Sequence, residues 1–186
     1  MAQANLLMDS LKGSSIMLYR AVQNEYREDV WKLIKNIQQK GFIIIYISNI
    51  KCYEDLKVEY KKYSIDENLI YFVDILSKKF MRNIPSNKCF YVDSPADLNS
   101  IVSNFSAVKK ICDKTQPSKS LVIFDNINNL FLDNEKSTIL KFVYNFIARI
   151  RKVNLPAIFI SLKEHADPDM IILLESITDT EISGQS

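Results

Sequence analysis

Glycine is scarce in this chain, with three glycines among 186 residues. The scarcity matters most over residues 15–34, where an apolar, strand-like segment runs into an amphipathic helix and the turn between them contains no glycine. Nucleotide phosphates are cradled by backbone N–H groups that converge in a glycine-rich turn. The sequence therefore predicts an α/β element pair without a phosphate cradle.

Cysteine is also scarce. Cys52, Cys89 and Cys112 are odd in number and far apart, which excludes a disulfide framework and a metal-ligand spacing. We interpret them as free, buried thiols in a reducing cytoplasm.

The single histidine, His165, has no second histidine or cysteine near it in the sequence. A catalytic Ser–His–Asp or Cys–His arrangement is therefore not indicated, and the sequence predicts no catalytic residue and no metal site. The acidic neighbours of His165 could hold a divalent ion by chance, but a solvated loop is the better interpretation. These neighbours are Glu164, Asp167 and Asp169.

Long apolar runs and a strong charge of one sign are both missing. The longest apolar stretches, "FIIIYI" and "MIILL", are far shorter than the roughly 20 residues of a membrane helix, and the first residues do not read as a secretory signal. A net charge of +2 provides no overall field for nucleic acid. We expect a soluble, cytoplasmic protein without membrane contact.

What the chain does have is a regular alternation of strand and helix patterns. Apolar, β-branched runs predict strands over 14–19, 42–48, 69–74, 120–125 and 155–161, with a short strand after Lys88 and a long loop over 75–88. Helical spacing predicts helices from about Val22 to a stop at Gly41, over 53–63, 134–153 and 167–176, and one capped by Ser94 that runs to Cys112. Strands that are apolar on both faces are covered on both faces. We predict one domain over 1–186, a three-layer α/β/α fold with a mostly parallel, doubly wound sheet.

The strand "LVIFD" ends in Asp125, which is the pattern of a Walker B strand whose carboxylate holds the water shell of Mg²⁺. An aspartate that merely caps the next turn gives the same pattern. Ser161 ends the neighbouring strand "AIFIS", where a hydroxyl could contact a γ-phosphate or lie in a turn.

Other charged groups have ordinary explanations. Glu25, Glu28 and Asp29 at the first helix start would repel phosphate, although acidic residues are also usual in a first helical turn. The lysines of the chain form modest basic clusters that we interpret as solvated surfaces. The group considered for nucleic acid is Lys109, Lys110, Lys114 and Lys119.

The order of "LKGSSIMLY", "GFIIIYIS", "IDENLIYFVD", "LVIFDNINNLFL", "LPAIFISLKE" and "ADPDMIILLESITDTEI" resembles the RecA/KaiC-like ATPase domain, a P-loop NTPase fold, over about residues 7–182. The resemblance is closest to archaeal KaiC-like proteins that have lost their ATPase motifs. It implies that Gly13 precedes the first strand as in the family, that Asp125 is a remnant Walker B aspartate, and that Ser161 matches the polar residue that ends the next strand.

The resemblance also shows where the chain departs from the family. Residues 20–29 stand in place of the Gly-rich loop and match none of it, so Walker A is degenerate. The family places catalytic glutamates after the strand that ends at Ser48, and this chain has Asn49, Ile50 and Lys51 there. The resemblance therefore implies a pseudo-ATPase without a cofactor.

We expect a catalytically inactive KaiC/RecA-like domain that works as a regulatory or scaffolding protein-interaction module, with a role in signalling as one option. Its partner would be another protein, related ATPase-like subunits among them. Two alternatives stay open. A pocket bordered by Asn49, Asp125 and Ser161 would favour a non-hydrolysing nucleotide or small-ligand binding protein. A continuous basic groove would favour an accessory single-stranded DNA-binding recombinase paralogue.

The predicted helix over 134–153 has an unusually wide apolar surface, which indicates either self-association or burial by neighbouring elements. Its apolar residues are Ile139, Leu140, Phe142, Val143, Tyr144, Phe146, Ile147 and Ile150.

Overall fold

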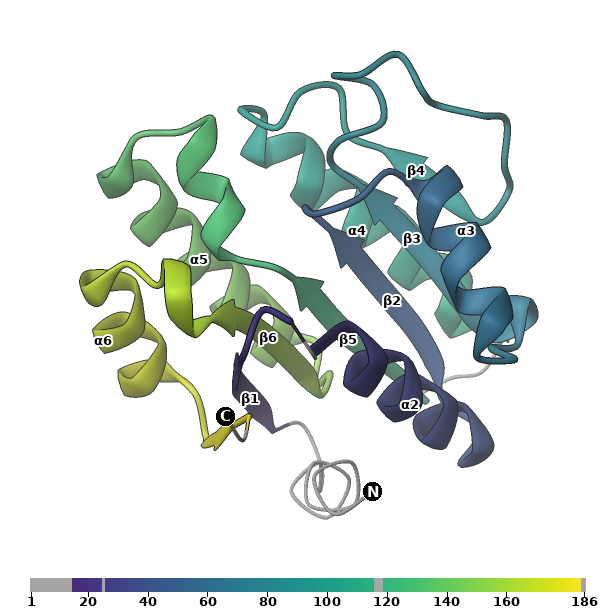
Figure 1. Cartoon of the computed structure of the whole chain (residues 1–186), viewed down its shortest axis with the longest axis horizontal. Coiled ribbons are helices and arrows are strands. Elements are labelled where there is room, and N and C mark those ends of the chain that lie inside the picture. The colour runs from purple at the N-terminus through teal and green to yellow at the C-terminus, as the bar shows by residue number, and fades with distance from the viewer. Residues whose placement is uncertain (1–14, 25, 116–118, 185–186) are drawn as a thin grey trace.

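The computed structural model describes residues 15–24, 26–115 and 119–184. Within these residues, seven parallel strands form one sheet in the order β4-β3-β2-β5-β6-β1-β7. Figure 1 shows this sheet with helices in front of it and behind it. The strands are β1 (Ile16–Ala21), β2 (Ile43–Ser48), β3 (Ile70–Asp74), β4 (Cys89–Tyr91), β5 (Ser120–Asp125), β6 (Ala157–Leu162) and β7 (Thr180–Ser183). The predicted three-layer, doubly wound α/β fold is confirmed.

Two hydrophobic cores lie on the two faces of the sheet, because successive strand side chains point to opposite sides. In β2, Ile43, Ile45 and Ile47 enter one core, and Ile44 and Tyr46 enter the other. Each such side chain contributes about 1.5–3 kcal/mol by its burial. The second core is covered by α2 (Tyr26–Gln39) and α3 (Tyr53–Lys62), and the first by α4 (Leu98–Thr115), α5 (Lys136–Lys152) and α6 (Pro168–Ile177).

Three short 3₁₀ helices lie next to strands within the described residues. η1 (Glu67–Leu69) precedes β3, η2 (Asn128–Leu132) follows β5, and η3 (Lys163–His165) follows β6. Gly41 follows α2 with φ +81°, and its N–H donates to the Gln38 carbonyl at 2.8 Å. The predicted helix stop at Gly41 is therefore confirmed, since glycine adopts this left-handed conformation without a steric penalty.

The start of α4 differs from the prediction. The Ser94 hydroxyl accepts only from the Ala96 N–H, within a turn, and the helix begins at Leu98. Asp97 is the residue whose carboxylate accepts a helical N–H, from Ser100 at 3.0 Å. The Ser-to-Asp spacing resembled a capping box, but the aspartate is itself the cap.

The final strand, β7, was not predicted, because it has four residues and only Ile182 is buried. It pairs with β1 at the edge of the sheet, from Met17↔Thr180 to Arg20↔Ser183. An exposed edge strand has too little apolar alternation to stand out in a sequence.

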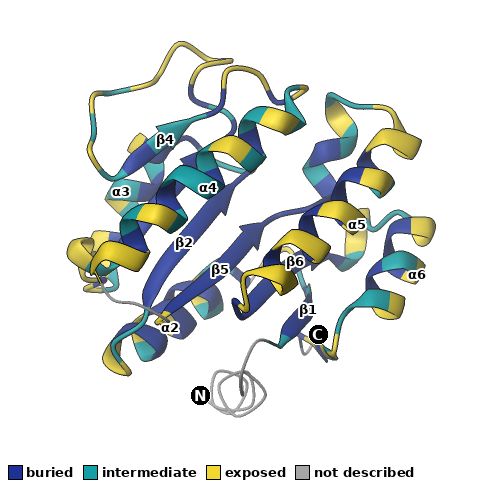
Figure 2. Cartoon of the chain, turned by 180° about the vertical axis from the view of Figure 1, so that it is seen from behind, coloured by how far each residue is buried: buried dark blue, intermediate teal, exposed yellow. Residues whose placement is uncertain are grey.

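The wide apolar surface of α5 is explained by its place between α4 and α6, which Figure 2 shows from behind. Leu140 is partly buried, and Tyr144 is 55% exposed. The other six predicted apolar residues are buried by the sheet and by the neighbouring helices: Ile139, Phe142, Val143, Phe146, Ile147 and Ile150. The apolar pattern of this helix therefore needs no second copy of the chain.

Candidate functional site

The carboxyl ends of β2 and β5 form a switch point of the sheet. The chain leaves β2 for β3 on one side and leaves β5 for β6 on the other side, although Ser48 and Asp125 are paired in register. Ligands of doubly wound folds bind in the crevice at such a point. Asp125 ends β5, Asn49 directly follows β2, and Ser161 lies near the end of the neighbouring strand β6, with 0%, 1% and 1% of their surface exposed.

Asp125 is bound by side chains of the protein itself. The Tyr46 hydroxyl donates to Asp125 Oδ2, and Nη1 of Arg27 lies 3.5 Å from the same oxygen. The Tyr26 hydroxyl also lies against this carboxylate. Arg27 belongs to the first turn of α2, so a guanidinium from this turn neutralises the aspartate at the end of β5.

Arg27 is in turn held by Glu59 of α3. Arg27 Nε donates to Glu59 Oε2 at 3.1 Å, and a second guanidinium nitrogen, Nη2, donates to the same oxygen. Trp31 Nε1 lies 3.3 Å from that oxygen, and Lys51 forms an ion pair with the other carboxylate oxygen. Asp125, Arg27, Glu59 and Lys51 thus form a continuous charge network, which joins β5 to α2 and α3.

Burial and charge shift the pKa values of this network in a consistent way. Burial raises the pKa of Asp125, and the charge of Arg27 and the hydrogen bond from Tyr46 offset this only in part. Burial and the nearby carboxylate raise the pKa of Tyr46, so its hydroxyl stays protonated and donates. Burial also acts on Glu59, but hydrogen bonds from Lys51 and Arg27 prevail and lower its pKa.

Residues 22–25 connect β1 to α2. The Tyr26 N–H donates to the Val22 carbonyl at 3.2 Å, so the helix follows the strand almost at once. Glu28 and Asp29 lie in the first turn of α2, as the sequence predicted. Gly13, named for the family resemblance, and Glu25, named for its charge at the helix start, lie outside the described residues.

A run of asparagines directly after β5 was missed by the sequence analysis. The Asn129 amide donates to the Asn49 carbonyl at 2.7 Å, and the Asn129 N–H donates to Asn126 Oδ1 at 3.1 Å. Asn128 accepts from the Leu162 N–H at 2.8 Å. These amides fasten the ends of β2, β5 and β6 together. The sequence "DNINN" could have predicted this arrangement, since Asn side chains commonly form hydrogen bonds with backbone groups in turns.

Four buried polar atoms at the same strand ends have no hydrogen-bond partner within the described part of the chain. They are Asn49 Nδ2, Asp125 Oδ1, Asn126 Nδ2 and Ser161 Oγ. Three surface hollows lie elsewhere: between α4 and α5, between α5 and α6, and between η2 and the loop at His165. The structure therefore brings the predicted site residues together, but none of these hollows is lined by them.

The loop at His165 has structural uses for its polar groups. His165 Nε2 lies 3.0 Å from Gln23 Oε1, and Glu164 accepts from the Gln23 N–H. Asp167 caps α6 by accepting from the Asp169 and Met170 N–H groups. Among residues 15–24, 26–115 and 119–184, no three His, Cys, Asp or Glu side chains gather as metal ligands would.

The four lysines considered for nucleic acid do not line the largest of these hollows. Lys109 pairs with Asp113 one turn later on α4. The basic residues that border the hollow between α4 and α5 are Arg149 and Lys152. In the part of the chain that the structure describes, no helix combines the length and the apolar character needed to cross a membrane.

No protein-family description and no curated protein matches the chain. Solved structures do match its fold. The KaiC-like protein PH0186 from the hyperthermophilic archaeon Pyrococcus horikoshii OT3 superimposes with a TM-score of 0.66 at 14% identity, over 94% of this chain and 74% of that one. The uncharacterized protein PH0321 from Pyrococcus horikoshii, crystallised with an unknown peptide, gives a TM-score of 0.78 at 10% identity, over 100% and 83% of the two chains. The fold of this chain is RecA/KaiC-like.

Proposed function

We propose that this chain is a catalytically inactive RecA/KaiC-like domain that acts as a regulatory or scaffolding module by binding another protein. The observation that carries the proposal is the ion pair between Asp125 and Arg27. In active P-loop enzymes, the corresponding aspartate serves Mg²⁺ and a lysine from the loop serves the phosphates. Here the first turn of α2 supplies a guanidinium to the aspartate, which supports the proposal that an internal cation replaces the metal.

The connection between β1 and α2 supports the same conclusion. A Walker A loop places four residues between its two glycines and adds a lysine and a hydroxyl residue after them. In this chain β1 ends at Ala21 and the described part of α2 begins at Tyr26, and none of residues 22–25 is glycine. Glu28 and Asp29 add negative charge at the helix start, where a helix dipole would otherwise favour an anion. These features support the proposal that the chain has lost the Walker A loop.

The position of the catalytic glutamates is a further support. Asn49 follows β2, its N–H donates to the Asp125 carbonyl at 2.6 Å, and its own carbonyl is bonded by Asn129. Lys51 pairs with Glu59. Phosphoryl transfer depends on positioned charge and a positioned nucleophile. The Asn49 backbone instead joins the ends of β2 and β5, and Lys51 pairs with α3, which supports the proposal that no catalytic glutamate acts here.

A binding role for the surface agrees with one of the comparisons. PH0321 was crystallised with an unknown peptide bound. Related ATPase-like subunits are among the partners that such a domain would bind.

A second candidate, a non-hydrolysing nucleotide or small-ligand binding protein, is favoured by the unpaired polar atoms at the strand ends. Asn49 Nδ2 and Ser161 Oγ are buried without partners among the described residues, and buried polar groups are nearly always bonded. A ligand of this kind would bind beside Asp125 without being hydrolysed.

Phosphate release from Mg-ATP tests the leading proposal. We expect turnover below about 10⁻⁴ s⁻¹, under the intrinsic rate of a slow GTPase. Asp125→Asn serves as the control for contaminating ATPases, because it removes the carboxylate and conserves shape. Turnover well above this level that disappears in Asp125→Asn would contradict the proposal.

A further inference from the structure

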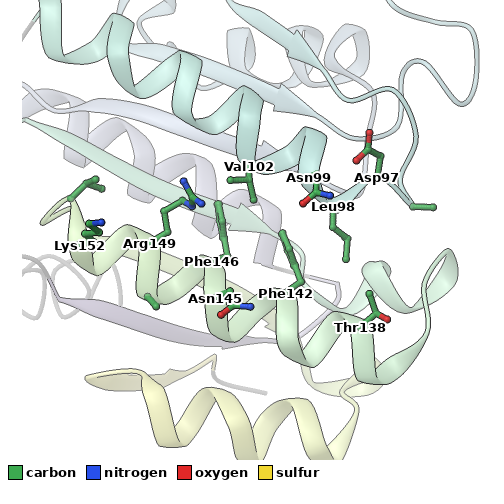
Figure 3. Close-up of a pocket in the computed structure, with 13 residues that line it drawn as sticks. Asp97, Leu98, Asn99, Val102, Thr138, Phe142, Asn145, Phe146, Arg149 and Lys152 are labelled. Carbon is green, nitrogen blue, oxygen red and sulfur yellow. The ribbon is translucent and has the colours of Figure 1, made fainter.

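A groove of about 920 Å³ runs between α4 and α5, on the face of the sheet opposite α2 and α3. We call it the α4–α5 groove. Figure 3 shows Leu98 and Val102 of α4 and Phe142 and Phe146 of α5 pointing into the space between the helices. Binding pockets have volumes of about 300–1,000 Å³ and mostly apolar linings. The α4–α5 groove has the size of such a site, and the partly buried Leu98 and Val102 are the apolar side chains that it offers to an occupant.

The two ends of this groove differ in charge. Arg149 and Lys152 lie at one end and Asp97 at the other (Figure 3). Both basic side chains are exposed, and neither forms an ion pair within the described part of the chain. The basic end therefore has charge that is available to a partner.

The basic end of the groove is formed by α5, a helix whose charged side chains are all positive. In α5 the charged residues are all basic: Lys136, Lys141, Arg149, Arg151 and Lys152. Lys136 is paired with Asp167 and Asp169, and Arg151 with Asp179, all on the side of α6. The charge that faces α4 is not compensated in this way, although the chain as a whole carries only +2. A local excess of this kind attracts an acidic group.

The lining favours a protein segment over a nucleic acid. A single strand needs positive charge along its length and open aromatic faces for its bases. Phe146 is 1% exposed and Phe142 is 9% exposed, so neither ring offers an open face, and Asp97 would repel phosphate at the far end. The partly buried Leu98 and Val102 offer apolar contact between the charged ends.

We propose that the α4–α5 groove binds a segment of a partner protein that carries apolar side chains in its middle and acidic side chains at the end that meets Arg149 and Lys152. The proposal rests on the proposed function, because it assigns to an interaction module the surface by which it binds. Apolar anchors flanked by complementary charge are a common mode of peptide recognition, with the anchors giving affinity and the charges giving orientation.

Selection from a displayed library of random 16-residue peptides tests this proposal, followed by fluorescence anisotropy with the enriched peptides. The groove variant is Arg149→Glu/Lys152→Glu. The matched control is Lys141→Glu, which changes an exposed basic residue of the same helix that does not line the groove. We expect the enriched peptides to combine apolar and acidic residues, to bind the groove variant at least about tenfold more weakly, and to bind the control within about twofold.

Two further variants keep the test independent of charge. Asn99→Trp places an indole in the groove from an exposed position of α4, and Ser103→Trp places one on the exposed surface of the same helix outside the lining. We expect Asn99→Trp alone to weaken peptide binding. Peptides with lysine in place of their acidic residues should regain affinity for the charge-reversed variant.

Equal peptide binding by all the variants, or no enriched peptide that depends on the groove, would overturn the proposal. Binding of a labelled oligothymidine that requires Arg149 and Lys152 would also overturn it and would assign the groove to nucleic acid. These outcomes are separate from the failure of the proposed function, because phosphate release from Mg-ATP is measured without peptide and the peptide assay contains no ATP.

Discussion

Asp74 and Asp125 end two strands that flank the same neighbour, and their carboxylates are held in opposite ways. Both are paired in register with Ser48 of β2, and both are fully buried. The Asp74 carboxylate accepts three backbone N–H groups at 2.6–2.8 Å and the Ser77 hydroxyl. The Asp125 carboxylate is bound instead by the side chains of Tyr46 and Arg27.

The comparison shows that an aspartate at the end of a buried strand has two distinct uses. Asp74 caps the turn that directly follows it, since Leu76 and Ser77 donate to it, and the Tyr53 N–H at the start of α3 is its third backbone donor. Asp125 is a long-range device, because Tyr46 lies 79 residues away in the sequence. The turn after β5 is bonded by Asn126, whose Oδ1 accepts from the Asn129 N–H. The interpretation of Asp125 as a turn cap is therefore wrong, and Asp74 is the aspartate that fits it.

The largest effect is expected for Asp74→Ala. This change leaves three buried N–H groups and a hydroxyl without an acceptor, and we expect a loss of about 4 kcal/mol in the free energy of unfolding. Urea denaturation measures the loss, and Asp74→Asn, which keeps one acceptor oxygen, should lose clearly less. A loss within about 1 kcal/mol for the alanine variant would show that water replaces the carboxylate without penalty.

A somewhat smaller effect is expected for Arg27→Met. Removing the guanidinium leaves the Asp125 carboxylate buried without a cation, which costs about 3 kcal/mol at neutral pH. Adding Asp125→Asn to Arg27→Met should restore about 1.5 kcal/mol, because the uncompensated charge is then gone. Strictly additive losses in this double-mutant cycle, measured by urea denaturation, would mean that the two side chains do not stabilise each other.

The pH dependence of stability should differ between wild type and Asp125→Asn. Burial raises the pKa of Asp125 in the folded chain, so between its unfolded value of about 4 and its folded value the folded state binds more protons. The stability that this carboxyl group contributes is present below the unfolded pKa and is lost as pH rises through the folded pKa. Wild type should therefore lose stability relative to Asp125→Asn as pH rises.

Urea denaturation of both proteins from about pH 4 to about pH 8 measures this difference. Glu59 acts in the opposite direction, because its lowered pKa gives stability that is lost as pH falls through the folded pKa. It is present in both proteins, so the difference between them isolates Asp125. A difference that is constant with pH would be incompatible with a raised pKa at this position.

The smallest effect is expected for Lys51→Ala. Lys51 pairs with Glu59 at the outer end of the charge network, and its side chain is 40% exposed. Exposed ion pairs contribute little, so we expect a loss of about 0.5 kcal/mol or less. Thermal denaturation measures it. A loss as large as that of Arg27→Met would place the energy of the network at its solvated end rather than at Asp125.

The sequence predicted most of the fold because buried parallel strands carry continuous apolar runs. β5 was predicted with the bounds that the structure gives it, and β2 differed by one residue. The last strand, β7, escaped because its side chains are mostly exposed. A local apolar pattern predicts a strand when the strand buries its side chains, and an edge strand buries few of them.

The sequence predicted where the site residues lie but not which groups bind them. Asn49, Asp125 and Ser161 were expected at neighbouring strand ends and lie there, buried. The strands "IYFVD" and "LVIFD" end alike, and nothing local separates the carboxylate that caps a turn from the one that binds Arg27. That distinction depends on which segments the fold brings together, so it required the structure.

Titration calorimetry of Mg-ATP into the wild-type chain tests the central claim most directly, which is that Arg27 holds Asp125 in place of a metal and a phosphate. We predict no binding tighter than about a millimolar, because the proposed function has no loop that cradles phosphate and has Arg27 paired with Asp125. Circular dichroism on the same samples would confirm that wild type and Asp125→Ala are folded. Micromolar binding by wild type that is lost in Asp125→Ala would contradict the account.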